Sequence, residues 1–480
     1  MKITSKRIAL LLFSLLMAFS AGCASGGEKS PTDSSSGAKP AGTQESAVLT
    51  LCVDKAYAGS ERYWGEGLIE PLIEYYETSH DHKVRMETLV ISDGEERSNQ
   101  IQKLQTEMMS GGGPDLFFFS SQQYGARYEG EIRQWLFKDF NKAMHLGSFA
   151  DLSSLMEADE SWDPAQFYEP VMQAGAIDGK QYILPVSITY PAVFAVDSER
   201  IRAADADSFL RLLTEEQVVF NRQIPSVFSS VQPLSLFSQP IDYAQEALRL
   251  TGEELAESVR LCDAYNQVSK GTAYNPEISD EENTARQETA QTVLSAENPL
   301  IAAYLGQPCF SIAQQAKEDD TGFSVYPVAS FDGEYPALVT DMAAVSAGSA
   351  HPQEAYDFIK LLLSKEIQSG NGFAVDKGDY SKFYGNLACS YLAGVPVRKD
   401  VTASQLYPNS QAFRPDIDLE DSDFSFPTDT ITAARFYTEY DARADLMNLG
   451  RTDAYKELSE DERQTAAADL YRDLKLAASE

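Results

Sequence analysis

Few residues of this chain could carry out chemistry, and none forms a known catalytic pattern. His80 and His82 flank Asp81, a spacing that could bind a metal ion, but we expect a solvated turn there. The sequence has no G-x-S-x-G elbow, no H-E-x-x-H pair and no phosphate-binding loop with the G-x-x-x-x-G-K-S/T pattern. We therefore expect no catalytic residues, no metal site and no cofactor.

Carboxylates are abundant, and two readings of them stay open. Residues 416–423 form an acidic run that could attract Ca²⁺, but the run lacks the glycine of an EF-type loop. An exposed acidic loop is the expectation there. A carboxylate pair suited to glycan hydrolysis is a weak signal among 73 acidic residues. A secreted cell-surface lipoprotein enzyme acting on glycans is therefore kept as the alternative function.

The thiol of Cys23 has a clear sequence context. A positive start at 2–7, an apolar core at 8–19 and the small residues 20–22 precede it, which is the order of an export signal. The apolar core is shorter than the ~20 residues of a membrane-spanning helix. The small residues before Cys23 resemble the lipobox of bacterial lipoproteins, whose cysteine is acylated. We expect residues 1–22 to be a removed signal peptide and Cys23 to carry palmitate; plain secretion is the alternative.

Residues 23–46 read as the acylated cysteine and a flexible tether. Their Gly, Ser, Pro and Lys residues cannot bury enough apolar surface to offset the entropy of ordering. A coil of this kind and length has a reach of roughly 25–30 Å. We therefore expect a protein anchored by lipid at the extracellular face of the cell membrane.

The net charge of the chain limits its partners. The formal charge is −34, and removal of the signal with its three basic residues leaves 36 basic against 73 acidic residues, or −37. Such a surface repels nucleic acid and anionic lipid headgroups. We expect no nucleic-acid partner, and the charge favours a neutral or cationic ligand.

Four cysteines remain after Cys23: Cys52, Cys262, Cys309 and Cys389. In an oxidising compartment they could form two disulfides, with three possible connectivities. The sequence has no C-x-x-C pair, and Cys52 stands in the apolar run 48–53 like a buried strand residue. We favour free buried thiols, with disulfides left open.

The elements that must position any site begin with alternating strands and helices. Apolar residues predict strands at 47–53, 83–91 and 114–119, and helical spacing predicts helices at 68–76 and 101–109. This β-α-β-α-β order implies a parallel sheet covered by helices on both faces. The fold class is therefore α/β.

The later elements are less regular. We expect a hairpin over 176–185 with an Asp-Gly turn, a β-rich stretch at 187–196 in an edge or crossing position, and a returning strand at 336–346. Helices are predicted at 351–364 and, behind a capping box, at 459–476. Residues 197–300 are mostly polar and helical. The 434 residues from 47 onward exceed what one core usually supports, so two lobes are expected.

The order and spacing of three stretches resemble the extracellular solute-binding proteins of bacterial ABC importers, in particular the carbohydrate-type family 1. The first two stretches are residues 65–117 and 174–196. The third consists of residues 327–333, 336–346 and 351–364, followed by Gly394-Val395-Pro396-Val397-Arg398-Lys399. The resemblance implies a type II periplasmic-binding-protein-like fold, in which two α/β lobes are joined by a hinge with a ligand cleft.

The resemblance also implies how the chain divides. Lobe 1 would contain 47–187 plus 340–397, and lobe 2 would contain 188–339 plus 398–480. The chain would cross between the lobes near 185–191, 339–342 and 396–398. A small solute, a sugar or oligosaccharide or a less usual one, would be captured by closure of the hinge and delivered to an ABC permease in the membrane. We expect a monomer that is not an enzyme.

The resemblance and the carboxyl ends of the strands together give the candidate ligand-binding residues, which are Tyr63, Trp64, Ser120, Ser121, Tyr124, Tyr190 and Asp341. Aromatic rings match the apolar C–H faces of sugars, and polar groups bind the hydroxyls. Asp341 interrupts an apolar strand and needs a partner, which could be a ligand hydroxyl, a backbone group or an arginine. For the aromatic residues packing within the protein is the alternative, and for the serines helix capping is.

Overall fold

The computed structural model describes residues 47–54, 69–80, 83–91, 96–119, 127–128, 131–132, 134–196, 233–269, 300–304, 308–369, 394–406, 419–421, 427–446 and 459–479. All of them belong to one compact unit, Glu45–Glu480. The signal and tether, including Cys23, lie outside the described residues, as do Cys389, His82 and most of the acidic run.

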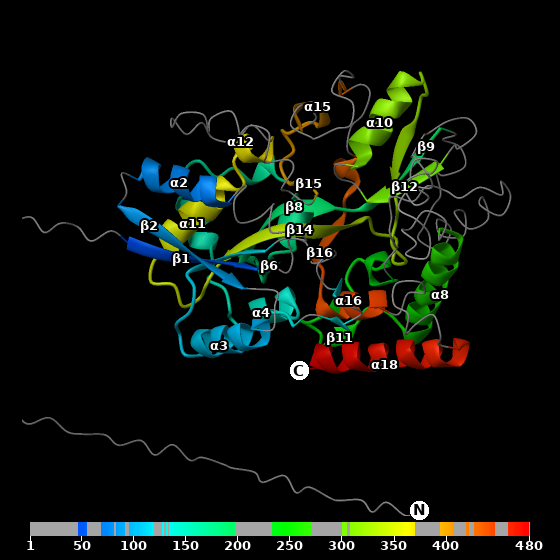
Figure 1. Cartoon of the computed structure of the whole chain (residues 1–480), viewed down its shortest axis with the longest axis horizontal. Coiled ribbons are helices and arrows are strands. Elements are labelled where there is room, and N and C mark those ends of the chain that lie inside the picture. The colour runs from blue at the N-terminus through cyan, green and yellow to red at the C-terminus, as the bar shows by residue number, and fades with distance from the viewer. Residues whose placement is uncertain are drawn as a thin grey trace, which may run out of the picture. The chain divides into compact units, whose positions relative to one another are not determined.

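A seven-stranded mixed sheet forms the centre of this unit (Figure 1). Its strand order is β15-β8-β14-β3-β1-β2, and β16 pairs with β14 outside that path. The strands are β1 (Ala47–Asp54), β2 (Val84–Ile91), β3 (Leu116–Phe119), β8 (Ile183–Thr189), β14 (Pro336–Val345), β15 (Val395–Pro396) and β16 (Ala433–Phe436). The first three are parallel to one another, as the alternation of strands and helices predicted.

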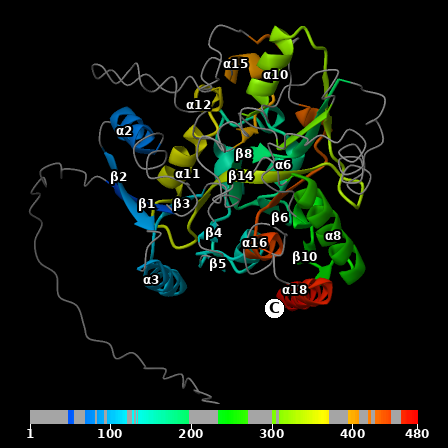
Figure 2. The same ribbon diagram turned by 45° about the vertical axis from the view of Figure 1, so that its right-hand side comes forward.

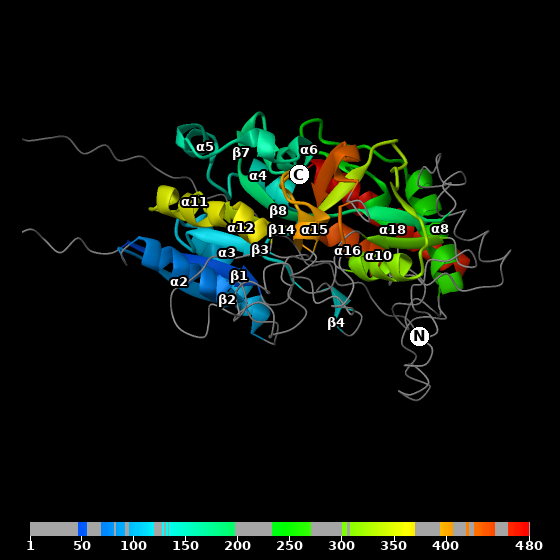
Figure 3. The same cartoon turned by 90° about the horizontal axis from the view of Figure 1, so that it is seen from above.

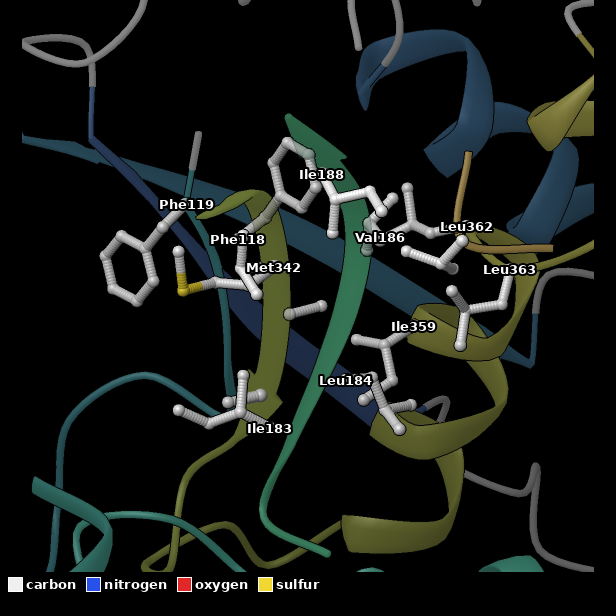
Figure 4. Packing of buried hydrophobic residues seen from close by; sticks show 14 of the residues in the cluster. Phe118, Phe119, Ile183, Leu184, Val186, Ile188, Met342, Ile359, Leu362 and Leu363 are labelled. Atoms are coloured by element: carbon white, nitrogen blue, oxygen red, sulfur yellow. The ribbon is translucent and has the colours of Figure 1, made fainter. Parts of the chain in front are cut away.

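Burial on both faces explains why several strands are almost continuously apolar. Every residue of β3, β8 and β14 is buried. Figure 4 shows Leu184 and Val186 of β8 facing Ile359 and Leu362 of the neighbouring helix. Cys52 is buried within β1, and Cys52, Cys262 and Cys309 are buried thiols that form no disulfide, which confirms the expectation for these three.

Helices cover the central sheet. They are α2 (Ile69–Ser79), α3 (Arg97–Met109), α4 (Phe140–His145), α5 (Ser153–Ala158), α6 (Glu169–Gln173), α11 (Pro352–Leu361), α12 (Lys365–Gln368) and α15 (Ala403–Leu406). Helices α11 and α12 run beside β8 and β14 (Figure 3). The predicted helix at 351–364 is shorter than expected, because α11 ends at Leu361 and Ser364 then caps α12.

The structure also contains a three-stranded antiparallel sheet. In it β9 (Pro191–Ala195) lies between β12 (Leu300–Tyr304) and β13 (Ser324–Pro327). Only Tyr190 separates β8 from β9, so the predicted β-rich stretch 187–196 is strand on both sides of Tyr190 and passes from one sheet to the other. Pro191 is the first residue of β9, a position at which the missing N–H of proline does not interrupt the hydrogen bonds of the sheet.

The remaining described part contains a smaller apolar cluster, in which α18 (Glu460–Ser479) packs against α8 (Gly252–Ser269) (Figure 2). The capping box of α18 is confirmed: the Ser459 hydroxyl accepts from the Glu462 N–H, and the Glu462 carboxylate accepts from Ser459. The other elements of this part are α16 (Glu439–Leu446), β10 (Ile241–Asp242), β11 (Ala247–Leu248) and the short 3₁₀ turn Pro233–Leu236. Helix α10 (Pro308–Glu318) packs on the main core instead, and another 3₁₀ turn covers Thr428–Thr430.

Short hairpins complete the described chain. Strands β6 (Ala176–Ile177) and β7 (Lys180–Gln181) pair across a two-residue turn in which Asp178 and Gly179 both have positive φ. This is the hairpin geometry that an Asp-Gly turn predicts. Strands β4 (Arg127–Tyr128) and β5 (Glu131–Ile132) form another pair, and a 3₁₀ turn covers Pro164–Gln166.

Candidate ligand site at the crossing strands

Two predicted site segments leave the same edge of the sheet. Strands β1 and β3 are parallel neighbours, with Val53 opposite Phe118. Their carboxyl ends therefore lie at the same edge of the sheet. Tyr63 and Trp64 follow β1, while Ser120, Ser121 and Tyr124 follow β3. These five residues lie outside the described residues, so their ligand role stays a prediction.

The ends of β3 and β16 converge on β14. Strand β8 occupies one edge of β14 along most of its length, so β3 and β16 share the other edge. Phe119 ends β3 opposite Met342, and Phe436 ends β16 opposite Val339. Only two residues of β14 lie between these positions, which corresponds to a separation of roughly 10 Å along the strand.

Those two residues are Thr340 and Asp341, and they form a buried polar cluster with Ser187 of β8. Asp341 is fully buried, and its carboxylate accepts a hydrogen bond from the Ser187 hydroxyl. The hydroxyls of Ser187 and Thr340 lie 2.5 Å apart. The expectation that Asp341 has a partner is confirmed, and one partner is a protein hydroxyl, which sequence reasoning did not foresee. Whether Asp341 also contacts a ligand stays a prediction.

The β8–β14 ladder is irregular at this cluster. Val339 pairs with Ile188 and Met342 with Pro185, but Ser187 pairs with Asp341, so Thr340 and Val186 are passed over. An irregularity of this kind bends a strand and re-aims its side chains. The polar cluster therefore marks the point at which both strands change direction.

Tyr190 lies where the chain passes from the seven-stranded to the three-stranded sheet. Its side chain is buried, and its hydroxyl has no hydrogen-bond partner in the described part of the chain. Burial, with smaller contributions from Cys309, Tyr168 and Asp429, raises the pKa of this phenol well above its ordinary value. Tyr190 is therefore neutral, and its hydroxyl keeps its hydrogen-bonding capacity.

A buried ion pair at the carboxyl end of β1 was missed by sequence reasoning. Arg97 donates two hydrogen bonds to Asp54, and its Nε donates to the Gln134 carbonyl at 2.9 Å. These contacts fix the start of α3 and the segment before α4 against the last residue of β1. The only sequence signal is an aspartate that ends an apolar strand.

Aromatic packing on the α4 side joins the two converging strand ends. The Phe140 ring lies 5.4 Å from that of Phe119 and 5.4 Å from that of Phe436. Trp135 stacks on Tyr437 with centroids 6.0 Å apart. The segment 135–140 therefore packs against residues from both ends of the gap on β14.

A small pocket, partly open to solvent, lies next to this packing, between the start of α4 and the residues around β10 and β16. Asp139 lines it; its carboxylate caps the Lys142 N–H at 3.1 Å and accepts from the Tyr243 hydroxyl. Burial raises the pKa of Asp139 above its ordinary value. Arg435, also on the wall, donates to the Leu234 carbonyl and to Asp441.

Metal and membrane features were searched over the described residues. None of their His, Cys, Asp and Glu side chains gather in threes around a possible metal position. The ring of His80 contacts the Tyr76 carbonyl at 2.8 Å. Among the helices the structure describes, none has the length and apolar character needed to cross a membrane.

Comparison with known proteins gives the family. The sequence profile of bacterial extracellular solute-binding proteins matches residues 72–372. No curated protein sequence matches the chain. Among solved structures, the sugar-binding protein MalE from Xanthomonas citri superposes with a TM-score of 0.52 at 11% identity, covering 90% of this chain and 98% of that one.

A second structure gives the same result. The galacto-N-biose/lacto-N-biose I-binding protein of a Bifidobacterium longum ABC transporter, in complex with lacto-N-biose, has a TM-score of 0.50 at 14% identity, covering 90% of this chain and 98% of that one. At such identities the likeness concerns the fold, which is the type II periplasmic-binding-protein fold expected from the sequence. The chain belongs to the bacterial extracellular solute-binding proteins.

Proposed function

We propose that this protein is the substrate-binding lipoprotein of an ABC transporter, which captures a sugar or oligosaccharide by hinge closure and delivers it to a membrane permease. The observation that carries the proposal is the arrangement of the three expected crossing segments. They are hydrogen-bonded neighbours in the order β15-β8-β14, and β14 pairs with β3 beyond Met342 and with β16 before Thr340.

The lobes we propose keep the expected boundaries, 47–187 plus 340–397 and 188–339 plus 398–480. The irregular pairing at Ser187 and Asp341 supports a division there, because it is the place where the ladder of β8 and β14 is weakest. A solute held between the end of β3 and the end of β16 would contact both lobes. Only a ligand that binds the closed form better than the open form can drive closure.

Carbohydrate is the proposed ligand class for two reasons. The two related structures are described as a sugar-binding protein and as a complex with lacto-N-biose. In addition, Tyr63 and Trp64 follow β1 and supply aromatic faces of the kind that stack on sugar rings. We propose that the protein binds its solute without changing it, acts as a monomer and needs no cofactor.

The function can be tested by thermal unfolding of the mature chain, with Cys23→Ser, against a panel of mono- and oligosaccharides. A bound sugar present at a hundredfold excess over its Kd adds about 2.7 kcal/mol to the unfolding free energy. We expect one structural class of sugar to raise the Tm and to be recovered intact by chromatography. Cleavage of that sugar would instead favour the glycan-acting enzyme.

The ligand contact is tested separately by calorimetry with the sugar that the panel identifies. Trp64→Ala should weaken binding at least tenfold, because stacking on a sugar face is lost. Trp162→Phe is the control, since Trp162 stacks on Phe167 within the protein at 4.8 Å. Equal affinities of Trp64→Ala and the parent would remove Trp64 from the site.

The lipid anchor is also a proposal, and it rests on Cys23 alone. Cells producing the full chain should incorporate a labelled palmitate into it, and the protein should partition into detergent. Cys23→Ala should abolish the label and release the protein from the membrane. Labelling that persists in this variant would contradict acylation at Cys23.

A further inference from the structure

Gln368, the last residue of α12, has a fully buried side chain whose amide group makes three hydrogen bonds. Its Nε2 donates to the Val186 carbonyl and to the Leu362 carbonyl, both at 2.9 Å. Its Oε1 accepts from the Val397 N–H at 2.9 Å. The amide thus joins three segments that are far apart in the sequence.

Two of these segments, β8 and the residues after β15, are proposed crossing segments. Gln368 hydrogen-bonds to both where their direct pairing stops. Strand β15 pairs with β8 through Val395 opposite Ile188 and Pro396 opposite Ser187. The next rung of this antiparallel ladder would join Val397 to Val186. Instead, the Gln368 amide lies between the two backbones and hydrogen-bonds to both. The third crossing segment therefore separates from β8 at this rung.

The pairing of β8 with β14, on the other edge of β8, is also irregular at Val186. Val186 is the β8 residue that the pairing with β14 passes over, and Ser187 next to it binds Asp341. The irregularity of the β8–β14 ladder and the separation of β8 from the 394–399 segment thus both fall at Val186. Gln368 ties this point to the Leu362 carbonyl at the end of α11, which is part of the main core.

We propose that Gln368 is a positioning residue for the hinge. By holding Val186 and Val397 to the end of α11, it fixes where two crossing segments begin to move with the second lobe, and so determines the geometry of the open and closed forms. A buried backbone group without a partner is strongly disfavoured. Loss of the amide would therefore let β8 and the 394–399 segment rearrange, and the pivot would lose its fixed position. This inference rests on the hinge closure of the proposed function.

The test measures the distance between the lobes without any ligand. Spin labels are placed on Lys103→Cys in α3 and Arg472→Cys in α18, whose native side chains are 76% and 65% exposed. Double electron–electron resonance on the mature chain with Cys23→Ser then gives the distance distribution. Cys389, which lies outside the described residues, is replaced by serine in every variant, and Cys52, Cys262 and Cys309 are buried, so the protein without the two introduced cysteines is the blank.

Three variants are compared with the parent. Gln368→Met removes all three hydrogen bonds at similar volume, and Gln368→Glu keeps the acceptor for Val397 but loses both donors. The control is Gln353→Met, because Gln353 is an exposed glutamine of α11 whose amide donates to the nearby Asp357 carboxylate. We expect the Gln368→Met distribution to broaden or shift by several ångströms, Gln368→Glu to change less, and Gln353→Met to match the parent.

The outcomes distinguish failure of the role proposed for Gln368 from failure of the proposed solute-binding function. A lower Tm for Gln368→Met and Gln368→Glu with unchanged distance distributions would make Gln368 a stabilising residue only and overturn the inference. If Gln368→Met does not fold, the distance distribution of Gln368→Glu is the test: an unchanged distribution overturns the inference, and a changed one supports it. Failure of the proposed function has a different signature: the parent distribution would not change with a sugar that raises the Tm.

Discussion

Arg97 and Asp54 form a doubly hydrogen-bonded ion pair at the carboxyl end of β1, with Nη1–Oδ1 and Nη2–Oδ2 distances of 2.6 and 2.8 Å. Both side chains are almost completely buried. The pair lies at the point where the chain leaves the sheet toward Tyr63 and Trp64. It therefore ties the end of β1 to the start of α3 and to the Gln134 carbonyl, just before the first proposed ligand-binding segment in the sequence.

Removing one member of this pair should be strongly destabilising. Asp54→Ala leaves the Arg97 guanidinium buried without its carboxylate, and we expect a loss of about 3–5 kcal/mol in the free energy of unfolding. Urea denaturation measures the loss. The control is Lys103→Ala, which removes the exposed Lys103–Glu107 pair and should cost less than about 1 kcal/mol. Similar losses for both variants would contradict the role assigned to the buried pair.

Gly394 should not tolerate a side chain. A Cβ at this position would lie 2.0 Å from the Ile188 carbonyl oxygen and 2.8 Å from the Thr340 hydroxyl, because the segment that begins at Gly394 lies directly against β8. We expect Gly394→Ala to cost about 1–3 kcal/mol through forced backbone shifts. Gly322→Ala, where a Cβ meets open space, is the matched control and should change the Tm little. A tolerated alanine at 394 would show that the crossing strands are loosely packed.

Asp159 and Lys360 should make stability depend on acid pH. Burial raises the pKa of Asp159, but hydrogen bonds from Lys360, Ser161 and Tyr356 together outweigh it and lower the pKa to about 2. A lowered pKa contributes stability above the ordinary value of 3.8, and this stability is lost as the pH falls toward 2. Lys360→Met should therefore cost about 1 kcal/mol at pH 7, since the pair is partly exposed.

The pH profile is the decisive measurement for this pair. The stability difference between the parent and Lys360→Met, from urea denaturation at a series of pH values, should shrink between pH 4 and pH 2. A difference that stays constant over this range would mean that Lys360 acts by packing on the Tyr356 ring, 5.8 Å away, rather than on the carboxylate.

The Asp139 carboxyl should contribute to stability with the opposite pH dependence to Asp159, although its hydrogen bond from Tyr243 favours the ionised form, as the one from Lys360 does for Asp159. Burial raises the pKa of Asp139, and nearby Asp441 raises it further, while the Tyr243 hydroxyl and the N–H groups of Lys142 and Asn141 lower it. A raised carboxyl pKa means that the neutral acid favours folding, and this contribution is lost as the pH rises through the folded-state pKa. Tyr243→Phe removes a hydrogen bond that stabilises the ionised form.

The variant should therefore be more destabilised, relative to the parent, at pH 7 than at pH 4. Thermal unfolding at both pH values measures this, with Tyr471→Phe on α18 as the control in the same part of the protein. Equal losses at the two pH values would show that the Tyr243 ring matters and its hydroxyl does not.

Local features of the sequence determined much of the fold. The alternation of strands and helices over residues 47–119 gave the parallel β1-β2-β3 arrangement. Asp178-Gly179 gave the hairpin turn, and the apolar spacing after His351-Pro352 gave the buried face of α11. These predictions held because turn chemistry, capping and burial periodicity act over a few neighbouring residues.

The tertiary structure alone decided how the crossing region is held together. Ser187 reaches Asp341 from 154 residues away, and Gln368 reaches Val186 from 182 residues away. The meeting of β3 and β16 at Thr340 likewise depends on the registers that both strands adopt on β14. No local pattern encodes such partners, because strand register is fixed by packing between distant segments and a shift of one residue would exchange every contact.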